Sequence, residues 1–437
     1  MERNKAMSFL NLLWLFTILY FCFGKFNWSI PSYFLLIFFV FCNYFAVNLG
    51  YGISVRKKRM ILYANNSIDD KKLIFNKYKK FFIVACVATI TFQIIWVVTF
   101  LDSFSFINVF NTIGDNYFER MEVEFNDVNI FMQMRTLFWV LTYFVYPIGF
   151  MFFKEMSLKY KCLFITTVII EIFASLNMGV SKNIGDLFLI LIMVIFLKNT
   201  TDKKTDTLFQ MKKKRKNYFK VGLLIIFFLL IFSLIQNSRD DVVGYVENPF
   251  VGFATIRENS FFENIFGKNS ALTILFDKIG YYLSHGYAGL AYALELPFEN
   301  TMGLGFSNSM LEYAIQYFGF PSDLMSATYN YRLNSVFGWK DGQWWSTSFV
   351  RIGNSVSLLF VPVIMYLLGY LFGKAENEWR EKKDVISLVF ECQLFIGFVY
   401  ASCNFQIFQG RQALIATFCL LFVYFVKNVL HLKITVK

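Results

Sequence analysis

The chain alternates between long apolar segments and short segments that hold most of its charged residues. The segments 30–52 and 81–101 each contain about twenty residues without a charge, which is what an α-helix needs to cross roughly 30 Å of hydrocarbon. Strand-like alternation of apolar and polar positions, typical of outer-membrane barrels, is not found. The pattern therefore predicts an all-α polytopic membrane protein. About ten spans are expected, at 8–24, 30–52, 81–101, 130–153, 162–178, 183–198, 221–237, 352–373, 385–402 and 412–426.

Composition points to the same class of protein. Apolar residues make up 57% of the 437 residues and charged residues only 16%, a balance that is atypical of soluble proteins. The seven Cys form no CxxC pair and lie in or beside apolar segments, so we interpret them as packing residues. The first apolar segment lacks the small-residue cleavage site of a signal peptide, and we expect it to be the first span.

Lys and Arg are distributed unequally between the two sides that these spans define. One side holds 30 of them and the other holds 11, while Arg135 lies within a span. Because Lys and Arg concentrate in cytoplasmic segments, both termini are expected in the cytoplasm. The net charge of +12 is therefore attributed to membrane orientation, and no nucleic-acid partner is expected. We interpret the basic runs 56–59 and 212–216 as topology anchors that also contact anionic membrane lipids.

The segments between the spans divide the chain into three parts. The first seven spans lie in 1–237, a large extracytoplasmic loop occupies 238–351, and the last three spans with a cytoplasmic tail lie in 352–437. The large loop is expected to carry most of the function. Two other external connections, near Lys182 and Arg411, are expected to be tight turns.

Two helices are predicted within the large loop. Residues 270–294 form an amphipathic pattern, with Leu272 on the apolar face and Asp277 and His285 roughly opposite. A second helix is predicted to start at Ser309 with a capping box and to end at Gly319. Such helices can lie in the membrane interface or dip into the membrane, and they can also simply cover the bundle of spans.

Several cationic side chains are candidates for binding an anionic group outside the membrane. A guanidinium fork suits phosphate oxygens, although a single external Arg is more often a solvated residue or an interface anchor. The candidates expected to converge are Arg239, Arg257, Arg351, Arg411, Lys182 and Arg135.

Two pairings would involve some of these cations. Arg135 and Glu171 lie at similar depths in neighbouring spans, and we hypothesise a buried ion pair that serves either as a fastening or in the site. Lys182 and Asp186 share a helix face and can pair with each other.

His285 is the only imidazole on the external side, since His431 lies on the cytoplasmic tail. An isolated His on an amphipathic helix is most often structural, yet here it is also the available general base. The sequence contains no GxSxG, HExxH or GxxxxGK[ST] motif, and no external DxD. The Gly303-Leu304-Gly305 element follows no predicted strand, so a dinucleotide site is not expected.

Several short motifs resemble those of Wzy-type bacterial polysaccharide polymerases, which join O-antigen or capsule repeat units. They are Tyr281-Tyr282-Leu283-Ser284-His285-Gly286-Tyr287-Ala288-Gly289-Leu290, Thr301-Met302-Gly303-Leu304-Gly305, Trp345-Ser346-Thr347 and Met178-Gly179-Val180-Ser181-Lys182. The three motifs of the large loop fall within about 70 residues, whereas the arrangement of many spans around one late external loop covers most of the chain. Lys182 departs from the Arg that family members often carry there, which keeps the charge but loses the fork.

The resemblance implies a GT-C-like fold and a specific reaction. A growing glycan would be transferred from undecaprenyl pyrophosphate to a hydroxyl of a new lipid-linked repeat unit, at the periplasmic or outer face of the bacterial inner (plasma) membrane. The expected partners are undecaprenyl-pyrophosphate-linked oligosaccharides, membrane lipids and a chain-length regulator of the Wzz type. No cofactor or metal is expected, because Arg can neutralise the pyrophosphate leaving group.

Roles for individual residues follow from the resemblance and from their chemistry. The six cations named above are expected to bind the pyrophosphate, and His285 is expected to be the general base, with Asp240 or Asp241 in reserve. The residues expected to contact sugars are Tyr287, Tyr329, Tyr331, Arg332 and Trp344.

Other functions remain open at this point. An O-antigen ligase would use the same donor with a lipid A core acceptor, and another lipid-linked-sugar glycosyltransferase would share the chemistry. A lipid-linked oligosaccharide flippase or transporter would more often show internal repeats or broken spans in matching halves, neither of which is evident. A membrane O-acyltransferase would place its His inside a span, whereas His285 lies in the loop.

Overall fold

The computed structural model describes residues 5–56, 68–100, 109–122, 130–200, 208–244, 246–268 and 270–428. The chain divides into two compact units, each made from segments that are distant in the sequence. Unit 1 comprises Met1–Leu62, Glu247–Asn377 and Gln393–Leu414, and unit 2 comprises Tyr63–Val246, Glu378–Cys392 and Ile415–Lys437. Most of the large loop predicted at 238–351 therefore belongs to unit 1.

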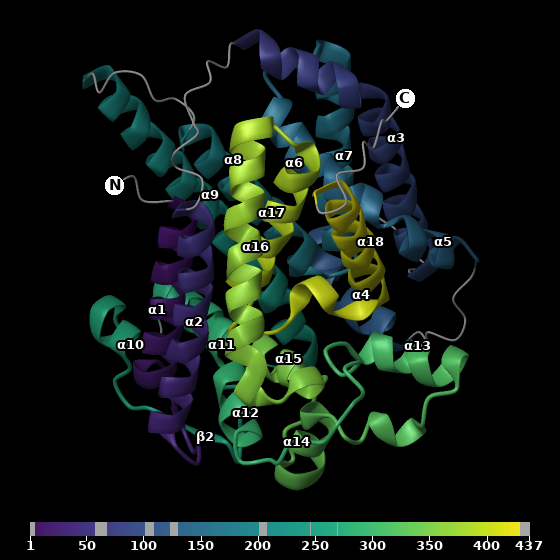
Figure 1. The fold of residues 1–437 in the computed structure, drawn as a ribbon. Coiled ribbons are helices and arrows are strands. Elements are labelled where there is room, and N and C mark those ends of the chain that lie inside the picture. The colour runs from purple at the N-terminus through teal and green to yellow at the C-terminus, as the bar shows by residue number, and fades with distance from the viewer. Residues whose placement is uncertain are drawn as a thin grey trace. The chain divides into compact units, whose positions relative to one another are not determined.

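The described residues are almost entirely helical, and seven of their helices are long and apolar enough to cross a membrane (Figure 1). The chain is thus a polytopic helical membrane protein, as its hydropathy pattern predicts. These helices are α1 (Lys5–Phe23), α2 (Tyr33–Arg56), α3 (Ile68–Phe100), α7 (Leu158–Asn177), α9 (Leu208–Val243), α16 (Val361–Lys382) and α18 (Gly410–Asn428).

The remaining predicted spans differ from continuous long helices. The span at 130–153 consists of α5 (Ile130–Phe138) and α6 (Val140–Phe152), which are bent by 49° relative to each other. The other two predicted spans correspond to α8 (Ser181–Thr200) and to the shorter apolar helix α17 (Val385–Val399).

The span predicted at 352–373 overlaps a candidate span at Leu358–Lys382, but its predicted start is wrong because the helix is interrupted. α15 (Ser348–Val356) ends at Ser357, which has a φ of 69°, and a short 3-10 turn (Leu358–Phe360) leads into α16. Pro362 follows at the start of α16, where the proline nitrogen has no hydrogen to donate back to Leu358 and needs none in a first helical turn. α15 therefore forms a separate buried helix, and α16 extends further along the chain than the prediction allowed.

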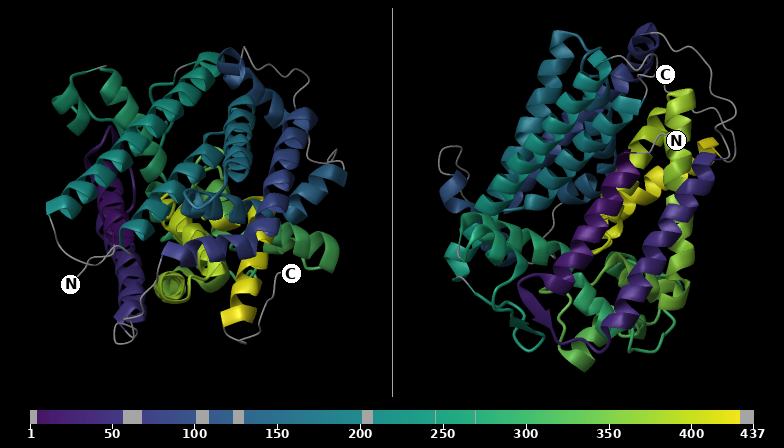
Figure 2. Two further views of the ribbon diagram at one scale, coloured as in Figure 1. Left: turned by 90° about the horizontal axis from the view of Figure 1, so that it is seen from above. Right: turned by 90° about the vertical axis from the view of Figure 1, so that its left-hand side faces the viewer.

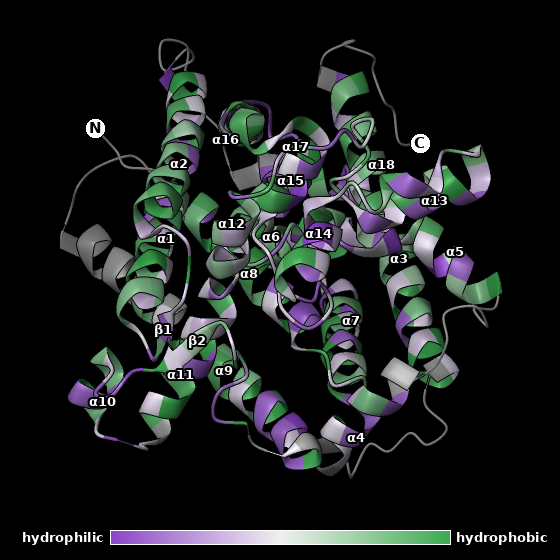
Figure 3. Cartoon of the chain, turned by 90° about the horizontal axis from the view of Figure 1, so that it is seen from below, coloured by the Kyte–Doolittle hydropathy of each residue, from purple (hydrophilic) through white to green (hydrophobic). Residues whose placement is uncertain are grey.

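α2 and α16 meet in unit 1 with their backbones almost in contact (Figure 1). A Cβ on Gly50 would lie 2.1 Å from the carbonyl oxygen of Tyr366, and a Cβ on Gly369 would lie 2.2 Å from that of Val47. Small residues at such positions let membrane helices approach closely. The remaining surface of α2 carries exposed phenylalanines and is mainly hydrophobic along its length (Figure 3). They are Phe34, Phe38, Phe41 and Phe45.

A small two-stranded sheet joins the start of unit 1 to its later segments. β1 (Phe26–Trp28), between α1 and α2, pairs antiparallel with β2 (Ala254–Ile256), with Phe26 opposite Ile256. Further helices of unit 1 follow β2 in the sequence. They are α10 (Phe261–Phe266), α11 (Ala271–Ser284), α12 (Gly286–Ala293), α13 (Asn308–Phe318) and α14 (Tyr329–Phe337).

The amphipathic helix predicted at 270–294 is two helices, α11 and α12, which meet at His285. Its burial is the reverse of the usual pattern, because Leu272 is 51% exposed whereas Asp277 is buried. The reason is that α11 packs against α1, where the Tyr20 hydroxyl donates a hydrogen bond to Asp277 at 3.0 Å. An apolar outer face with polar side chains inward is the arrangement expected for a helix that contacts lipid.

The second predicted helix, α13, begins close to its expected position but not with the expected cap. Its N-cap is Ser307 rather than Ser309, and the Ser307 hydroxyl donates to the carbonyl of Phe408 at 2.9 Å. Gly319 ends the helix in the left-handed conformation, with a φ of 68°, as predicted.

Unit 2 contains a bundle in which α3 packs against α6 and α7, while α8 packs against α7 and α9 (Figure 2). α4 (Val109–Glu122) packs against α9, where the Ser238 hydroxyl accepts the Gly114 N–H at 2.9 Å. The connection between α7 and α8 is tight, as predicted near Lys182, because Gly179 adopts a φ of 61° beside Tyr117.

Candidate functional site

Unit 1 contains a cavity of about 350 Å³ with both charged and aromatic walls. Its lining comes from the segment before α13, the turn before α15, α15 itself and the segment between α17 and α18. The lining residues are Phe306, Ser307, Asn308, Asp341, Gly342, Trp345, Arg351, Asn404, Phe405, Phe408, Gln409 and Gly410. Such a volume is in the range of small-molecule sites.

Arg351 is the charged centre of this cavity. Its Nη2 donates to both carboxylate oxygens of Asp341, at 2.6 and 2.8 Å, and its Nη1 donates to the side-chain oxygen of Asn308 at 2.8 Å. Only 8% of Arg351 is exposed. The guanidinium is therefore held in a fixed orientation by a protein carboxylate, whereas the sequence predicted a bound anion at this Arg.

Two carboxamides hold Asp341 from its other sides. Asn308 Nδ2 donates to one carboxylate oxygen at 3.2 Å, and Asn330 Nδ2 donates to the other at 3.1 Å. Asn330 is itself fixed by Asn354, whose Nδ2 donates to the Asn330 oxygen at 2.9 Å. Because Asn330, Asn354 and Arg351 are buried and these groups satisfy one another, the network orients the carboxylate.

The segment between α17 and α18 supplies the opposite wall and is not the tight turn that was predicted near Arg411. Its residues 400–408 are buried, and the Asn404 amide donates to Gln409 at 2.7 Å. The backbone carbonyl of Ala401 accepts both the N–H and the hydroxyl of Ser348, each at 3.0 Å. The buried backbone of a long connection needs such partners, and they come from α15.

Arg411 follows the lining residue Gly410 directly and is more exposed than Arg351. Its Nη2 lies 3.3 Å from a carboxylate oxygen of Glu312, and its guanidinium lies 5.6 Å from the ring centroid of Tyr313. Nearly half of each charged side chain is exposed, so the pair is weakly held.

His285 does not line the cavity but fixes a residue that does. Its Nε2 accepts the backbone N–H of Trp345 at 3.0 Å, and its Nδ1 lies 2.9 Å from the carbonyl of Tyr281, to which it donates. Burial lowers the pKa of His285 to about 4, so the ring is neutral at physiological pH. The general-base role expected for His285 finds no support here, because the lone pair a base would use already accepts a hydrogen bond.

The residues expected to contact sugars lie elsewhere among the described residues. Tyr287 is buried, and its hydroxyl bonds to Thr17 at 2.9 Å and to Tyr44 at 2.7 Å. Trp344 donates its Nε1–H to the carbonyl of Pro249 and packs against Phe253. These two side chains act in packing.

The other expected sugar contacts form a separate group on α14. Tyr329 is buried, and the guanidinium of Arg332 lies over its ring at 5.1 Å. Arg332 also pairs with Glu299 at 2.9 Å, while Tyr331 is 52% exposed. Four aromatic residues do line the cavity, three of them phenylalanines. The fourth is Trp345, which the Trp345-Ser346-Thr347 motif had singled out only as a resemblance.

The expected convergence of six cations on one cavity is only partly matched. Within unit 1, Arg351 lines the cavity and Arg411 adjoins it. Arg257 instead donates to the carbonyl of Cys22 at 2.8 Å, which ties the β2 end to α1. Arg135, Lys182 and Arg239, like Asp240 and Asp241, belong to unit 2.

Two of the three candidate cations in unit 2, Arg239 and Lys182, lie at the connection between α7 and α8. Arg239 donates to the carbonyl of Gly179 and stacks on the ring of Tyr117 at 3.8 Å. Lys182 pairs with Asp186 at 3.0 Å, as the spacing predicted. Asp240 and Asp241 lie at the end of α9.

The hypothesised pair of Arg135 and Glu171 is not formed as a direct ion pair in the part of the chain that the structure describes. Glu171 accepts hydrogen bonds from Gln93 and Tyr146 instead. The Arg135 guanidinium lies between two indoles, 4.6 Å from the ring centroid of Trp96 and 4.5 Å from that of Trp139. The two aromatic faces attract the cation where a carboxylate was expected.

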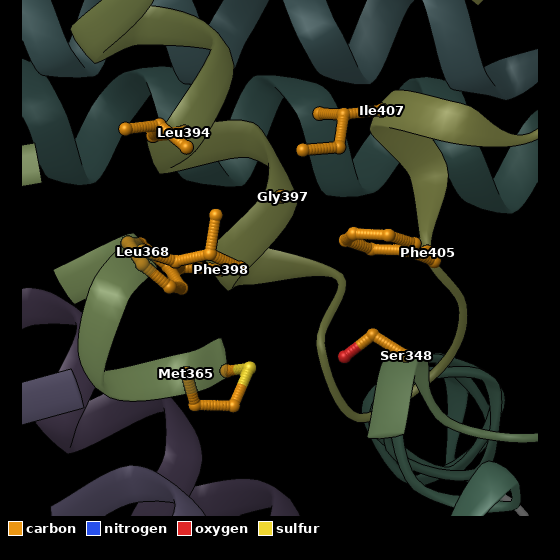
Figure 4. A pocket seen from close by; sticks show the side chains of 8 residues that line it. All are labelled: Ser348, Met365, Leu368, Leu394, Gly397, Phe398, Phe405 and Ile407. Atoms are coloured by element: carbon orange, nitrogen blue, oxygen red, sulfur yellow. The ribbon is translucent and has the colours of Figure 1, made fainter. Parts of the chain in front are cut away.

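A second, smaller void lies in unit 1 beside the same connecting segment (Figure 4). Met365, Leu368 and Phe398 face Phe405 and Ile407 across it. At about 10 Å³ it has room for roughly one water molecule, so it is a packing defect rather than a lipid-binding slot. No group of three or more His, Cys, Asp or Glu suited to a metal occurs among the described residues.

Comparisons of the chain with protein-family models, with curated proteins and with solved structures find no match.

Proposed function

We propose that this protein transfers a glycan from a polyprenyl pyrophosphate carrier to a sugar hydroxyl, with the unit 1 cavity as the active site. The observation that carries the proposal is Arg351, a buried guanidinium that lines a cavity beside a carboxylate, several carboxamides and an indole. The cationic side of the cavity suits the departing pyrophosphate.

The neutral walls of the cavity suit a saccharide. Carboxamides can both donate to and accept from sugar hydroxyls, and Asn308, Asn404 and Gln409 supply three of them. Trp345 adds a large apolar face with two rotatable bonds, against which a sugar ring can pack. A pocket that combines aromatic walls with fixed polar groups is typical of small-molecule sites.

The membrane character of the chain supports a lipid-linked substrate. Seven helices are long and apolar enough to span a bilayer, and α2 exposes a row of phenylalanines that a polyprenyl chain or lipid can contact. We propose the ten-span topology with both termini in the cytoplasm and the cavity facing outward, because Lys and Arg concentrate on the opposite side. In this proposed topology Arg351 lies on the outer side, where the resemblance implies that lipid-linked repeat units are polymerised.

Among enzymes that use such donors, the motif resemblance favours a repeat-unit polymerase of O-antigen or capsule biosynthesis. In this proposal Arg351 and Arg411 stabilise the leaving pyrophosphate. These two arginines take the place of the six cations that the sequence predicted. A chain-length regulator of the Wzz type is proposed as a partner on the same resemblance.

The decisive experiment uses purified protein in nanodiscs with undecaprenyl-pyrophosphate-linked repeat units, without nucleotide or added metal. The products are resolved by glycan length. We expect a ladder with wild type and with Lys268→Gln, which removes an exposed cation of the same unit, and at least a hundredfold less product with Arg351→Gln.

Two other outcomes would redirect the assignment. Transfer only after addition of lipid A core would select a ligase. Neither product from folded protein, combined with movement of the lipid-linked unit across the bilayer, would select a flippase or transporter.

A further inference from the structure

We infer that Asp341 is the proton acceptor of the unit 1 cavity and that Arg351 masks it until a diphosphate takes its place on the guanidinium. This inference rests on the proposed function and adds a catalytic carboxylate together with the control of its activity.

The first step is geometric. Arg351 Nη2 donates to both oxygens of Asp341, at 2.6 and 2.8 Å. Phosphate oxygens are recognised by the same planar donors that recognise a carboxylate. A diphosphate in this cavity and the Asp341 carboxylate are therefore alternative ligands of the same N–H groups.

The second step concerns charge. A carboxylate within about 4 Å of a diphosphate would repel it strongly in a buried site. Binding the diphosphate thus favours the arrangement in which the diphosphate replaces the carboxylate on Arg351. Arg411 directly follows Gly410, which lines the cavity, and is a second cation on this wall. Its guanidinium can therefore share in neutralising the negative charge of the diphosphate.

The third step concerns what remains around Asp341 once Arg351 is engaged by the ligand. Asn308 and Asn330 each donate to one of its oxygens, at 3.2 and 3.1 Å. These neutral donors keep the carboxylate in place without the stabilisation that a guanidinium gives to its charged form. Carboxylate oxygens that no longer accept from the guanidinium have lone pairs free for a hydroxyl proton, so Asp341 can act as the proton acceptor when the donor arrives.

The reaction at this site balances without any further reactant. The acceptor hydroxyl gives its proton to a carboxylate oxygen of Asp341 as its oxygen forms the new bond to the anomeric carbon. The bond between that carbon and the pyrophosphate oxygen breaks, and its electron pair leaves with the pyrophosphate, which Arg351 and Arg411 stabilise. Before the donor binds, both oxygens of the carboxylate accept hydrogen bonds from Arg351.

The test separates binding from transfer and uses the full-length protein in nanodiscs. Inorganic pyrophosphate binding is measured by calorimetry for wild type, Asp341→Asn, Arg351→Gln and the double variant. We expect roughly tenfold tighter binding for Asp341→Asn, because the competing carboxylate is gone, and at least tenfold weaker binding for Arg351→Gln. The double variant should bind like Arg351→Gln, since the gain acts through the guanidinium.

A matched control is available in the same unit. The Glu299 carboxylate forms an ion pair with the Arg332 guanidinium at 2.9 Å, and Glu299 does not line the cavity. Glu299→Gln should leave pyrophosphate affinity unchanged. In the transfer assay, Asp341→Asn should lose at least a hundredfold in turnover although it binds pyrophosphate more tightly.

Weaker or unchanged pyrophosphate binding by folded Asp341→Asn would overturn the inference and make the pair purely structural. If that variant unfolds at a lower temperature than wild type, Asp341→Ser, whose hydroxyl can still accept from Asn330, provides the same comparison. A glycan ladder that survives Asp341→Asn but not Arg351→Gln would reject the exchange and keep the proposed function. Tighter binding by Asp341→Asn without any ladder from wild type would keep the exchange and reject the polymerase.

Discussion

The Nε2 atom of His285 accepts the backbone N–H of Trp345 at 3.0 Å, and this contact links the junction of α11 and α12 to a wall of the cavity. The junction is also packed tightly elsewhere, because a Cβ on Gly286 would lie 2.4 Å from the carbonyl oxygen of Ser402. His285 therefore acts on the site by positioning Trp345, and its protonation state should be visible in stability rather than in proton transfer.

Stability should fall in acid through His285. Burial lowers its pKa to about 4 from 6.5, so the unfolded state binds more protons between these values, and stability decreases as the pH falls from about 6.5 towards 4. The full effect is about 3 kcal/mol. Thermal unfolding of wild type and His285→Gln should be compared in one detergent. The free energy of unfolding of wild type should exceed that of the variant by about 1 to 2 kcal/mol at pH 7.5, and this difference should become smaller at lower pH. A difference in unfolding free energy that is constant with pH would contradict the assignment of the acid sensitivity to His285.

Asp277 should produce the opposite dependence on pH. Burial raises its pKa to about 6 from 3.8, so the folded state binds more protons in this range and stability decreases as the pH rises through it. Asp277→Asn keeps an oxygen acceptor for the Tyr20 hydroxyl, and it should raise stability by about 1 to 2 kcal/mol at pH 7.5. The gain should vanish near pH 4.

The control for this change is Asp323→Asn, which alters an exposed carboxylate of the same unit. Its melting temperature should follow that of wild type at every pH. An equal gain for both variants would point to net charge rather than to burial of Asp277.

The contact between α2 and α16 should be sensitive to a single methyl group. Gly50→Ala places a Cβ 2.1 Å from the carbonyl oxygen of Tyr366, and separating the helices should cost about 1 to 3 kcal/mol. Gly52 lies on the same helix with nothing within 4 Å of its Cβ position, so Gly52→Ala should be neutral or slightly stabilising. Melting temperatures of the two variants in detergent provide the measurement.

Neighbouring tryptophans should separate function from packing. Trp345 lines the cavity, so Trp345→Ala should raise the KM for the saccharide acceptor about tenfold or more with a smaller effect on folding. Trp344 packs against Phe253, at 5.1 Å between ring centroids, and against Trp339, so Trp344→Ala should lower stability by about 3 kcal/mol. Loss of acceptor affinity in Trp344→Ala alone, at full stability, would restore the sugar-binding role that the sequence predicted for it.

The sequence predicts most of the helices because their signal is local. α7 at Leu158–Asn177 and α2 at Tyr33–Arg56 fall within a few residues of their predicted spans, since an uninterrupted apolar segment forms a helix wherever water is excluded. The predictions are wrong where a break depends on backbone conformation. The left-handed Ser357 is not visible in an apolar pattern, although Pro362 is a signal that could have located the end of α15.

Candidate site residues were predictable by type but not by partner. Arg351 is recognisable as a rare cation beside an apolar segment, and it does line the cavity. Asp341, which engages it, stands in a polar stretch of the loop that resembles any other solvated turn. His285 stood out as the only external imidazole, yet rarity in the sequence says nothing about whether its lone pair is already used.

What the sequence by itself determined is the class of the protein, the position of most membrane helices and the asymmetry of positive charge, because hydropathy and charge act over neighbouring residues. What only the tertiary structure decided is which polar groups meet. Asn308, Asp341 and Arg351 come from three separate segments and are joined by hydrogen bonds that satisfy their polar groups. Many loop residues could satisfy a buried guanidinium, and packing in three dimensions decides which of them does. The sequence pattern therefore does not show which residue is the partner.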